Sequence, residues 1–176
     1  MPNPNISEAL KEAYASAPSN VVVIDTIEIM HPAFSEPIRV ASGYEPIDAR
    51  LEQTATVNPG EIVTFQPFAF ELKLPEVFER GVPELELKID NVSLEIIRNV
   101  ELAMPQPELL QLVYRAYLST DLLNGPHNSP PLRLTITQIE ADAMTVTAKA
   151  SVGEFINKKF PNEEYTDAVY PNLITE

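Results

Sequence analysis

The stretch LRLTITQIEADAMTVTAKA, residues 132–150, carries the pattern that decides the fold. Apolar side chains occupy every second position in each half, at Leu132, Leu134 and Ile136 and again at Met144, Val146, Ala148 and Ala150. This period of two is typical of β-strands with one face in the core and one in water. The same alternation recurs at Leu85, Leu87 and Ile89, so the sequence predicts three strands of this kind.

Further strands are predicted on both sides of these segments. Residues 21–30, 38–41 and 109–118 are rich in apolar and β-branched side chains, which favour buried strands. Asn58-Pro59-Gly60 has the Pro-Gly pair of a type II turn, so residues 49–57 and 62–72 are expected to form a hairpin. Pro67 lies within the second strand and predicts a sheet edge or a bulge there.

Two segments favour helices. Asn5 and Glu8 have the spacing of a capping box, which predicts a helix over about 6–17 that ends before Pro18. In residues 91–104 the apolar side chains recur every three to four positions, which is the helical period. We therefore expect a mainly β fold, a β-sandwich or barrel with one or two helices. It forms a single domain, 1–176, with an extended tail at about 153–176.

The composition limits the function. The chain has 176 residues, a formal charge of −14 and no cysteine, which excludes disulfides and thiolate chemistry. Its 12 basic residues are scattered, so we expect no binding to nucleic acid or to an anionic membrane. No apolar run approaches the roughly 20 residues of a membrane span. The N-terminus lacks a signal-peptide pattern, so synthesis in the cytoplasm is expected.

No residue pattern points to catalysis. His31 and His127 lack the spacing of a metal pair and are expected to be turn or surface residues. A Gly-x-Ser-x-Gly elbow and a phosphate-binding loop are absent from the sequence. Paired acids, such as Asp25 with Glu28 or Glu163 with Glu164, are expected to be solvated. We therefore expect neither an enzyme nor a bound cofactor or metal ion.

Aromatic side chains are the candidate partner-binding residues. Phe65 and Phe68 lie on the second strand of the hairpin, where core packing is the first interpretation and a partner-facing patch the second. Phe160, Tyr165 and Tyr170 lie in the tail, which has no regular period and therefore gives them less reason to be core residues.

Several stretches, in this order, resemble a phage-related family of tail proteins long labelled as a domain of unknown function. The resemblance spans nearly the whole chain and extends to the minor tail protein M, or distal tail protein, of lambda-like siphophages. It rests on residues 27–34 and 36–39, 68–72, 85–93, 114–121, 160–166 and 170–173. One departure is Tyr170-Pro171-Asn172, where the family often has Phe-Pro-Gly.

The resemblance implies a structural role in the virion tail. Such proteins are similar to the tail-tube fold and form rings, commonly hexamers, that join the tail tube to the distal hub. DNA would pass through the ring without specific binding, since an acidic wall repels phosphate. Glu84 and Glu86, on the polar face of one strand, are the candidates to line or flank this channel.

Two other interpretations stay open. A small carbohydrate-binding or glycoside-cleaving β module would place an aromatic residue, such as Tyr44 or Tyr117, beside paired acids. A chaperone-like or regulatory cytosolic β protein would show no such site.

Overall fold

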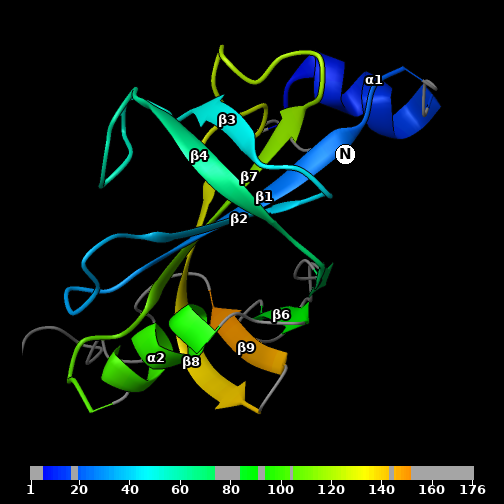
Figure 1. The fold of residues 1–176 in the computed structure, drawn as a ribbon. Coiled ribbons are helices and arrows are strands. Elements are labelled where there is room, and N and C mark those ends of the chain that lie inside the picture. Colours follow the sequence, from blue (N-terminus) through cyan, green and yellow to red (C-terminus); the bar gives the residue numbers. More distant parts are fainter. Residues whose placement is uncertain are drawn as a thin grey trace, which may run out of the picture.

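The computed structural model describes residues 6–16, 20–73, 84–90, 94–103, 105–142 and 145–151. Within them the fold is mainly β with two helices, as expected from the sequence, and its nine strands form one sheet (Figure 1). The elements are α1 (Glu8–Ser16), β1 (Val23–Met30), β2 (Ile38–Ser42), β3 (Ile47–Arg50), β4 (Ile62–Phe68), β5 (Phe70–Lys73), β6 (Glu84–Asp90), α2 (Leu94–Ala103), β7 (Gln111–Leu118), β8 (Leu132–Ala141) and β9 (Thr145–Ser151).

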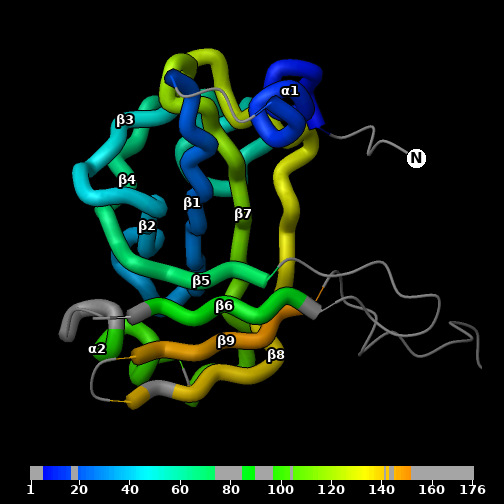
Figure 2. The backbone as a smooth tube through the Cα atoms, turned by 90° about the vertical axis from the view of Figure 1, so that its right-hand side faces the viewer, coloured from blue at the N-terminus to red at the C-terminus, as the bar shows by residue number. Residues whose placement is uncertain are grey.

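The sheet has the strand order β3-β4-β2-β1-β7-β8-β9-β6-β5 and folds over itself at two corners. β8 pairs with β7 through its first residues and with β9 through the rest, with a register shift between Ile136 and Gln138. On the other side, β4 continues through Ala69 directly into β5, which pairs with β6. Figure 2 shows the result: β5, β6 and β9 run across the direction of β1, β2 and β7. Bulges and bends of this kind make the corners of orthogonal sandwiches.

The nine described strands do not close into a barrel. Its ends are β3 and β5, and the two halves are joined by the chain that runs from β4 to β5. The sandwich-like alternative of the sequence interpretation is therefore the better description, because two curved halves of one sheet enclose the core.

The main core fills the space between the two halves. The alternating apolar residues expected from the sequence point into it, with Leu85, Leu87 and Ile89 at most 1% exposed. Ile27, Leu112 and Leu134 enter from the other half. Leu10 of α1 and Val100 of α2 also belong to this cluster, so each helix packs against the core by one apolar face.

A smaller apolar cluster lies on the second face of the sheet, beneath residues 51–61, which we name loop 51–61. It contains Ala49, Leu51, Phe65 and Tyr117. The Phe65 and Tyr117 rings lie 6.3 Å apart at an angle of 56°. The Tyr117 hydroxyl donates a hydrogen bond to the backbone oxygen of Arg50, 2.9 Å away.

Local structure corrects the sequence predictions at the hairpin. β3 and β4 do pair in antiparallel fashion, but β3 ends at Arg50 and loop 51–61 replaces the strand expected over 49–57. The turn predicted at Asn58-Pro59-Gly60 does form: the Glu61 amide donates to the Asn58 backbone oxygen at 3.1 Å, and Gly60 has the positive φ, 70°, that a type II turn requires there. At Pro67, β4 pairs with β2 on one side, whereas β3 on the other side pairs only as far as Phe65. Pro67 therefore lies at a local edge of the sheet, as predicted.

The helix boundaries follow their caps. Ser7 caps α1 through its Oγ, which accepts the Leu10 amide at 3.2 Å, while Asn5, the residue expected to cap, lies outside the described residues. α2 ends at Ala103, two residues before Pro105, as expected. Neither helix among the described residues is long and apolar enough to cross a membrane.

Candidate interaction site

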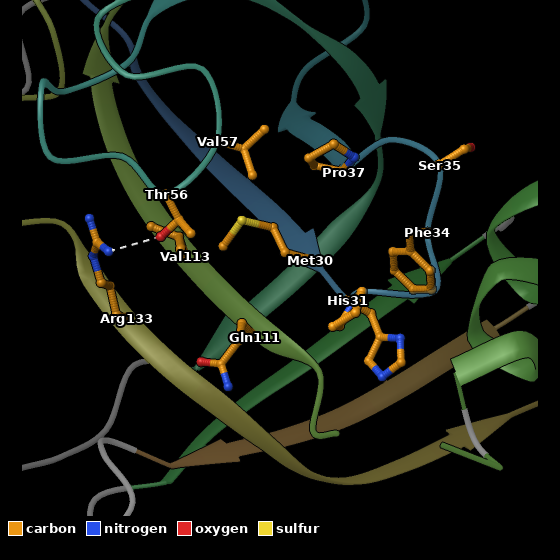
Figure 3. A pocket seen from close by; sticks show the side chains of 11 residues that line it. Met30, His31, Phe34, Ser35, Pro37, Thr56, Val57, Gln111, Val113 and Arg133 are labelled. Atoms are coloured by element: carbon orange, nitrogen blue, oxygen red, sulfur yellow. Dashed lines mark hydrogen bonds between the residues drawn. The ribbon is translucent and has the colours of Figure 1, made fainter. Parts of the chain in front are cut away.

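A pocket of about 440 Å³ opens on the second face of the sheet (Figure 3). The end of β1, the start of β7, β8, the β1–β2 connection and loop 51–61 all contribute to its wall. Most lining side chains are apolar: Met30, Pro32, Phe34, Pro37, Val57 and Val113. The polar ones are His31, Ser35, Thr56, Gln111 and Arg133. A largely apolar pocket with a few polar groups is the usual form of a binding site.

His31 fixes the β1–β2 connection at the edge of this pocket. Its Nδ1 accepts the Ala33 amide at 3.1 Å, so its Nε2 carries the proton and donates to the Glu108 backbone oxygen, also at 3.1 Å. The ring lies 5.6 Å from that of Phe34. His31 is thus a buried turn histidine whose two nitrogens are both used by the backbone, which agrees with the turn role expected for it.

A network of charged side chains lies beside the pocket and holds loop 51–61 against the sheet. At its centre, Arg115 binds Glu52 through two contacts, Nε to Oε2 at 2.7 Å and Nη2 to Oε1 at 3.1 Å. Its Nη1 lies 2.9 Å from Oε2 of Glu28. Arg39 binds the other oxygen of Glu28 at 2.8 Å and donates to Oδ1 of Asn58 at 2.8 Å. The sheet and the loop are therefore connected through charged groups.

Arg133 connects this network with the pocket. Its Nη2 lies 3.5 Å from Glu52 Oε1, and its Nη1 donates to Thr56 Oγ1 at 3.2 Å, the contact drawn in Figure 3. Its side chain is 43% exposed, whereas those of Arg115 and Glu28 are each 1% exposed. Arg133 is thus the most exposed cation of the network and the one that lines the pocket.

The charges of the network shift two pKa values. Burial raises the pKa of Glu52, but the hydrogen bonds and charge of Arg115 outweigh it, so this pKa lies below the usual range. Burial lowers the pKa of Arg115, and the Glu52 hydrogen bonds together with the Glu28 charge more than offset that effect. Both residues remain ionised, as a structural ion pair requires.

A second polar cluster joins α1 to the sheet at the opposite end of β1. The Tyr114 hydroxyl donates to Asp25 Oδ1 at 2.8 Å. Burial raises the pKa of Asp25, and the Tyr114 hydrogen bond opposes the shift only in part. Burial and the Asp25 charge raise the pKa of Tyr114 and of Tyr14. All three shifts favour the protonated forms of the Asp25 carboxyl and of the two tyrosine hydroxyls.

Both clusters correct the expectation that Asp25 and Glu28 are solvated. Glu28 is 1% exposed, and Asp25 is partly buried beneath Tyr114. The signal was present in the sequence: Glu28 and Arg115 stand within strands whose neighbours are apolar on both sides. A charge in such a position must be paired. His127, expected to be a turn or surface residue, lies in the β7–β8 connection with its side chain 11% exposed, and its Nε2 is 3.6 Å from Asp121 Oδ2.

The candidate interface residues fall in different places. Phe65 is 0% exposed in the core, so core packing is its role and the expectation of a partner-facing patch is corrected there. Phe68, at the end of β4, is partly buried against the main core. Phe160, Tyr165 and Tyr170 lie outside the described residues.

The two candidate channel residues are on β6. Glu84 is its first residue, and its side chain lies outside the described part of the structure. Glu86 is exposed and pairs with Lys73 of β5 at 3.2 Å. The exposed acidic residue Glu86 of β6 is therefore paired with a cation, Lys73 of the neighbouring strand.

Within the part of the chain that the structure describes, Tyr117 does not form a sugar-binding site and the acidic residues do not form a metal-binding site. Tyr117, a candidate sugar platform, is 0% exposed and cannot stack on a ligand, while Tyr44 is fully exposed in the β2–β3 turn. Among the described residues, no group of three or more histidine, aspartate or glutamate side chains is arranged to hold a metal ion.

A family model described as "Domain of unknown function (DUF1833)" matches residues 9–165. The chain belongs to this family. The DUF1833 match covers all the described strands, α2 and all of α1 except its first residue, so the family model corresponds to the fold described above. A search of curated proteins finds no match.

Proposed function

We propose that this DUF1833 chain is a structural minor tail protein of a siphophage-like virion. It forms a ring, commonly a hexamer in related tails, that joins the tail tube to the distal hub. The proposal draws on the ordered resemblance to phage tail proteins and on the mainly β, sandwich-like fold with flanking helices.

The observation that carries the proposal is the open edge of the sheet at β5. Within the described residues β5 pairs with β6 on one side only. Its side chains alternate, with Phe70 and Leu72 partly buried and Glu71 and Lys73 exposed. An unpaired edge offers backbone donors and acceptors to another chain. A head-to-tail contact of this kind between identical subunits gives a ring when the rotation from one subunit to the next closes.

The charge supports the same role. A chain of −14 has little affinity for a DNA backbone, which suits a channel through which DNA passes. Glu84 and Glu86 are the candidates for its wall, with Lys73 beside Glu86. A map of the ring in which β6 faces away from the lumen would remove this part of the proposal.

The test is the assembly state of the purified chain, measured by light scattering and electron microscopy, alone and with the neighbouring tube and hub proteins. We expect annular particles with a central channel. A stable monomer under all of these conditions would overturn the proposal.

A matched pair of variants locates the contact. Successive backbone amides of a strand point to opposite sides. Of Glu71→Pro and Leu72→Pro, one therefore removes an amide that faces β6 and the other removes an amide at the free edge. We expect the free-edge variant to keep its fold, judged by circular dichroism, and to lose the ring. Rings from both variants would exclude β5 as the contact.

A further inference from the structure

The pocket beside Arg133 lies close to the point where the described chain ends. Sheet register places Met30 opposite Gln111, Gln111 opposite Thr135, and Thr135 opposite Ser151, the last residue of β9. These four residues form one row across four strands and share a face, because paired residues in antiparallel strands point to the same side. Met30 and Gln111 line the pocket. Segment 152–176 thus starts at one end of a row whose two far members, Gln111 and Met30, line the pocket.

The distances allow this segment to enter the pocket. At about 4.8 Å between strands, Ser151 is about 10 Å from Gln111 and about 14 Å from Met30. At about 3.3 Å per residue, Phe155 spans about 13 Å from Ser151 when fully extended, and Phe160 spans about 30 Å. Phe160 therefore reaches the whole pocket with slack, whereas Phe155 barely reaches its far wall.

The chemistry of the two parts is complementary. The pocket is apolar, and among its described lining residues Arg133 is cationic and none is acidic. Segment 152–176 carries four aromatic residues, five acidic residues and two lysines. Phe160, Pro161 and Asn162 are followed by Glu163 and Glu164. An apolar anchor with carboxylates three residues on matches an apolar pocket that has a guanidinium at its rim.

The hydroxyl of Ser151, where segment 152–176 begins, is buried. Ser151 is 2% exposed, and its Oγ has no hydrogen-bond partner among the described residues. Buried hydroxyls are normally satisfied. Backbone that turns from Ser151 back along the row toward Thr135 would supply a partner.

We propose that the C-terminal segment of this chain docks into the pocket of the same chain, with Phe160 as the apolar anchor and Glu163 or Glu164 beside Arg133. The docked segment covers Met30 and Val113 and ties loop 51–61 to the end of β9. This docking within one chain does not depend on the ring proposed above.

One other segment outside the described residues offers an aromatic occupant. Residues 74–83 contain Phe78, but they are held at both ends, by Lys73 of β5 and Glu84 of β6. Glu84 pairs with Ser151 on the far side from β8, so this segment starts one strand further from the pocket. Segment 152–176 starts nearer to the pocket, which favours it.

The test uses the absence of cysteine from the chain. The full-length double variant Thr56→Cys/Asn162→Cys places one thiol at the exposed rim of the pocket and one between Phe160 and Glu163. On mild oxidation we expect a disulfide within one chain, seen as a chain of monomeric mass on a non-reducing gel and as a linked peptide pair after digestion. The matched control is Tyr44→Cys/Asn162→Cys, whose exposed first thiol lies past the far end of β2; we expect no disulfide from it.

Further variants test the anchor and the charge. Adding Phe160→Ser to the Thr56/Asn162 pair removes a buried ring, so the rate of disulfide formation should fall by about tenfold or more. Adding Phe155→Ser should change it little. Equal rates for the two cysteine pairs, no disulfide in either, or no effect of Phe160→Ser would overturn the proposal. Disulfide-linked dimers alone would overturn docking within one chain and assign the pocket to the segment of a second copy.

Discussion

Arg115 and Glu28 lie on adjacent antiparallel strands, and Nη1 of Arg115 is 2.9 Å from Oε2 of Glu28 with 1% of each side chain exposed. The pair is diagonal, since Thr26 is the residue opposite Arg115. Arg39 binds the second oxygen of Glu28, and Glu52 binds the other donors of Arg115. The second face of the sheet therefore depends on charges that water does not reach.

Removing one member of this network is expected to destabilise the fold strongly. Glu28→Ala leaves Arg39 and Arg115 close together without the carboxylate between them, and a broken buried pair costs about 3–5 kcal/mol. The free energy of unfolding, measured by urea titration, should fall by that amount. The matched control is Glu86→Ala, which breaks the exposed pair with Lys73 and should cost about 0.2–1 kcal/mol. Equal losses from the two variants would contradict the central role of Glu28.

Glu52 should make the fold sensitive to acid. Its folded pKa lies below that of the unfolded chain, so its contribution is present above about pH 4.5 and is lost as the pH falls through the folded value. Glu52→Gln should therefore destabilise the protein at neutral pH and flatten the acid side of its stability profile. Urea titrations of both proteins across the acid range measure the difference. A constant difference down to the acid limit would show that the charge of Glu52 is not what stabilises loop 51–61.

The contribution of Asp25 to stability should change with pH in the opposite direction to that of Glu52. Its folded pKa is raised, so its favourable contribution is complete below the unfolded value, near pH 3.8, and is lost as the pH rises through the raised folded value. Asp25→Asn keeps an acceptor for the Tyr114 hydroxyl and removes the desolvated charge. Relative to the wild type, the variant should gain stability between acidic and neutral pH. A relative loss over that interval, in the same titrations, would contradict the raised pKa.

Much of the fold could be predicted from the sequence because alternation is a local signal. Most of the alternating apolar side chains lie in the core as predicted, namely Leu85, Leu87, Ile89, Leu134, Ile136, Val146, Ala148 and Ala150, while Met144 lies outside the described residues. The two helices form close to where the capping pattern and the helical period predict them. The corners could not be predicted. The bend at Ala69 and the register shift at Ile136 and Gln138 depend on the packing of strands far apart in the sequence. An open sheet and a barrel share the same local pattern.

The candidate site was harder to predict for a related reason. A charged residue within an apolar strand, such as Glu28, is recognisable in the sequence, but its partners come from β2, β7 and loop 51–61. The pocket depends on the path of the β1–β2 connection and of that loop, where hydrogen bonds of His31 and Asn58 decide the geometry. Neither bond has a sequence signature that distinguishes it from an ordinary turn.

Gly60 should be required for loop 51–61. Its φ of 70° is in the left-handed region, where an L side chain costs about 1–2 kcal/mol. A Cβ at this position would also collide with the end of the Gln53 side chain. Gly60→Ala should therefore lower the free energy of unfolding by at least that amount. The double variant Gln53→Ala/Gly60→Ala removes the collision and should recover only part of the loss. Full recovery would show that the collision, and not the backbone, requires glycine.

Phe65 provides a test that separates the core from an interface. Its ring is 0% exposed and packs against Tyr117, whose hydroxyl binds the Arg50 backbone oxygen beneath loop 51–61. Phe65→Ala should lower the free energy of unfolding by about 3–5 kcal/mol, because truncating a buried ring leaves a cavity. Phe65→Leu fills most of that space, so its loss should be much smaller and the variant should stay folded. Because no part of the ring reaches the surface, the folded Phe65→Leu protein should assemble as the wild type does in sedimentation at equal concentration. If Phe65→Leu assembled more weakly with an unchanged free energy of unfolding, Phe65 would be an interface residue, which would contradict its packing beneath loop 51–61.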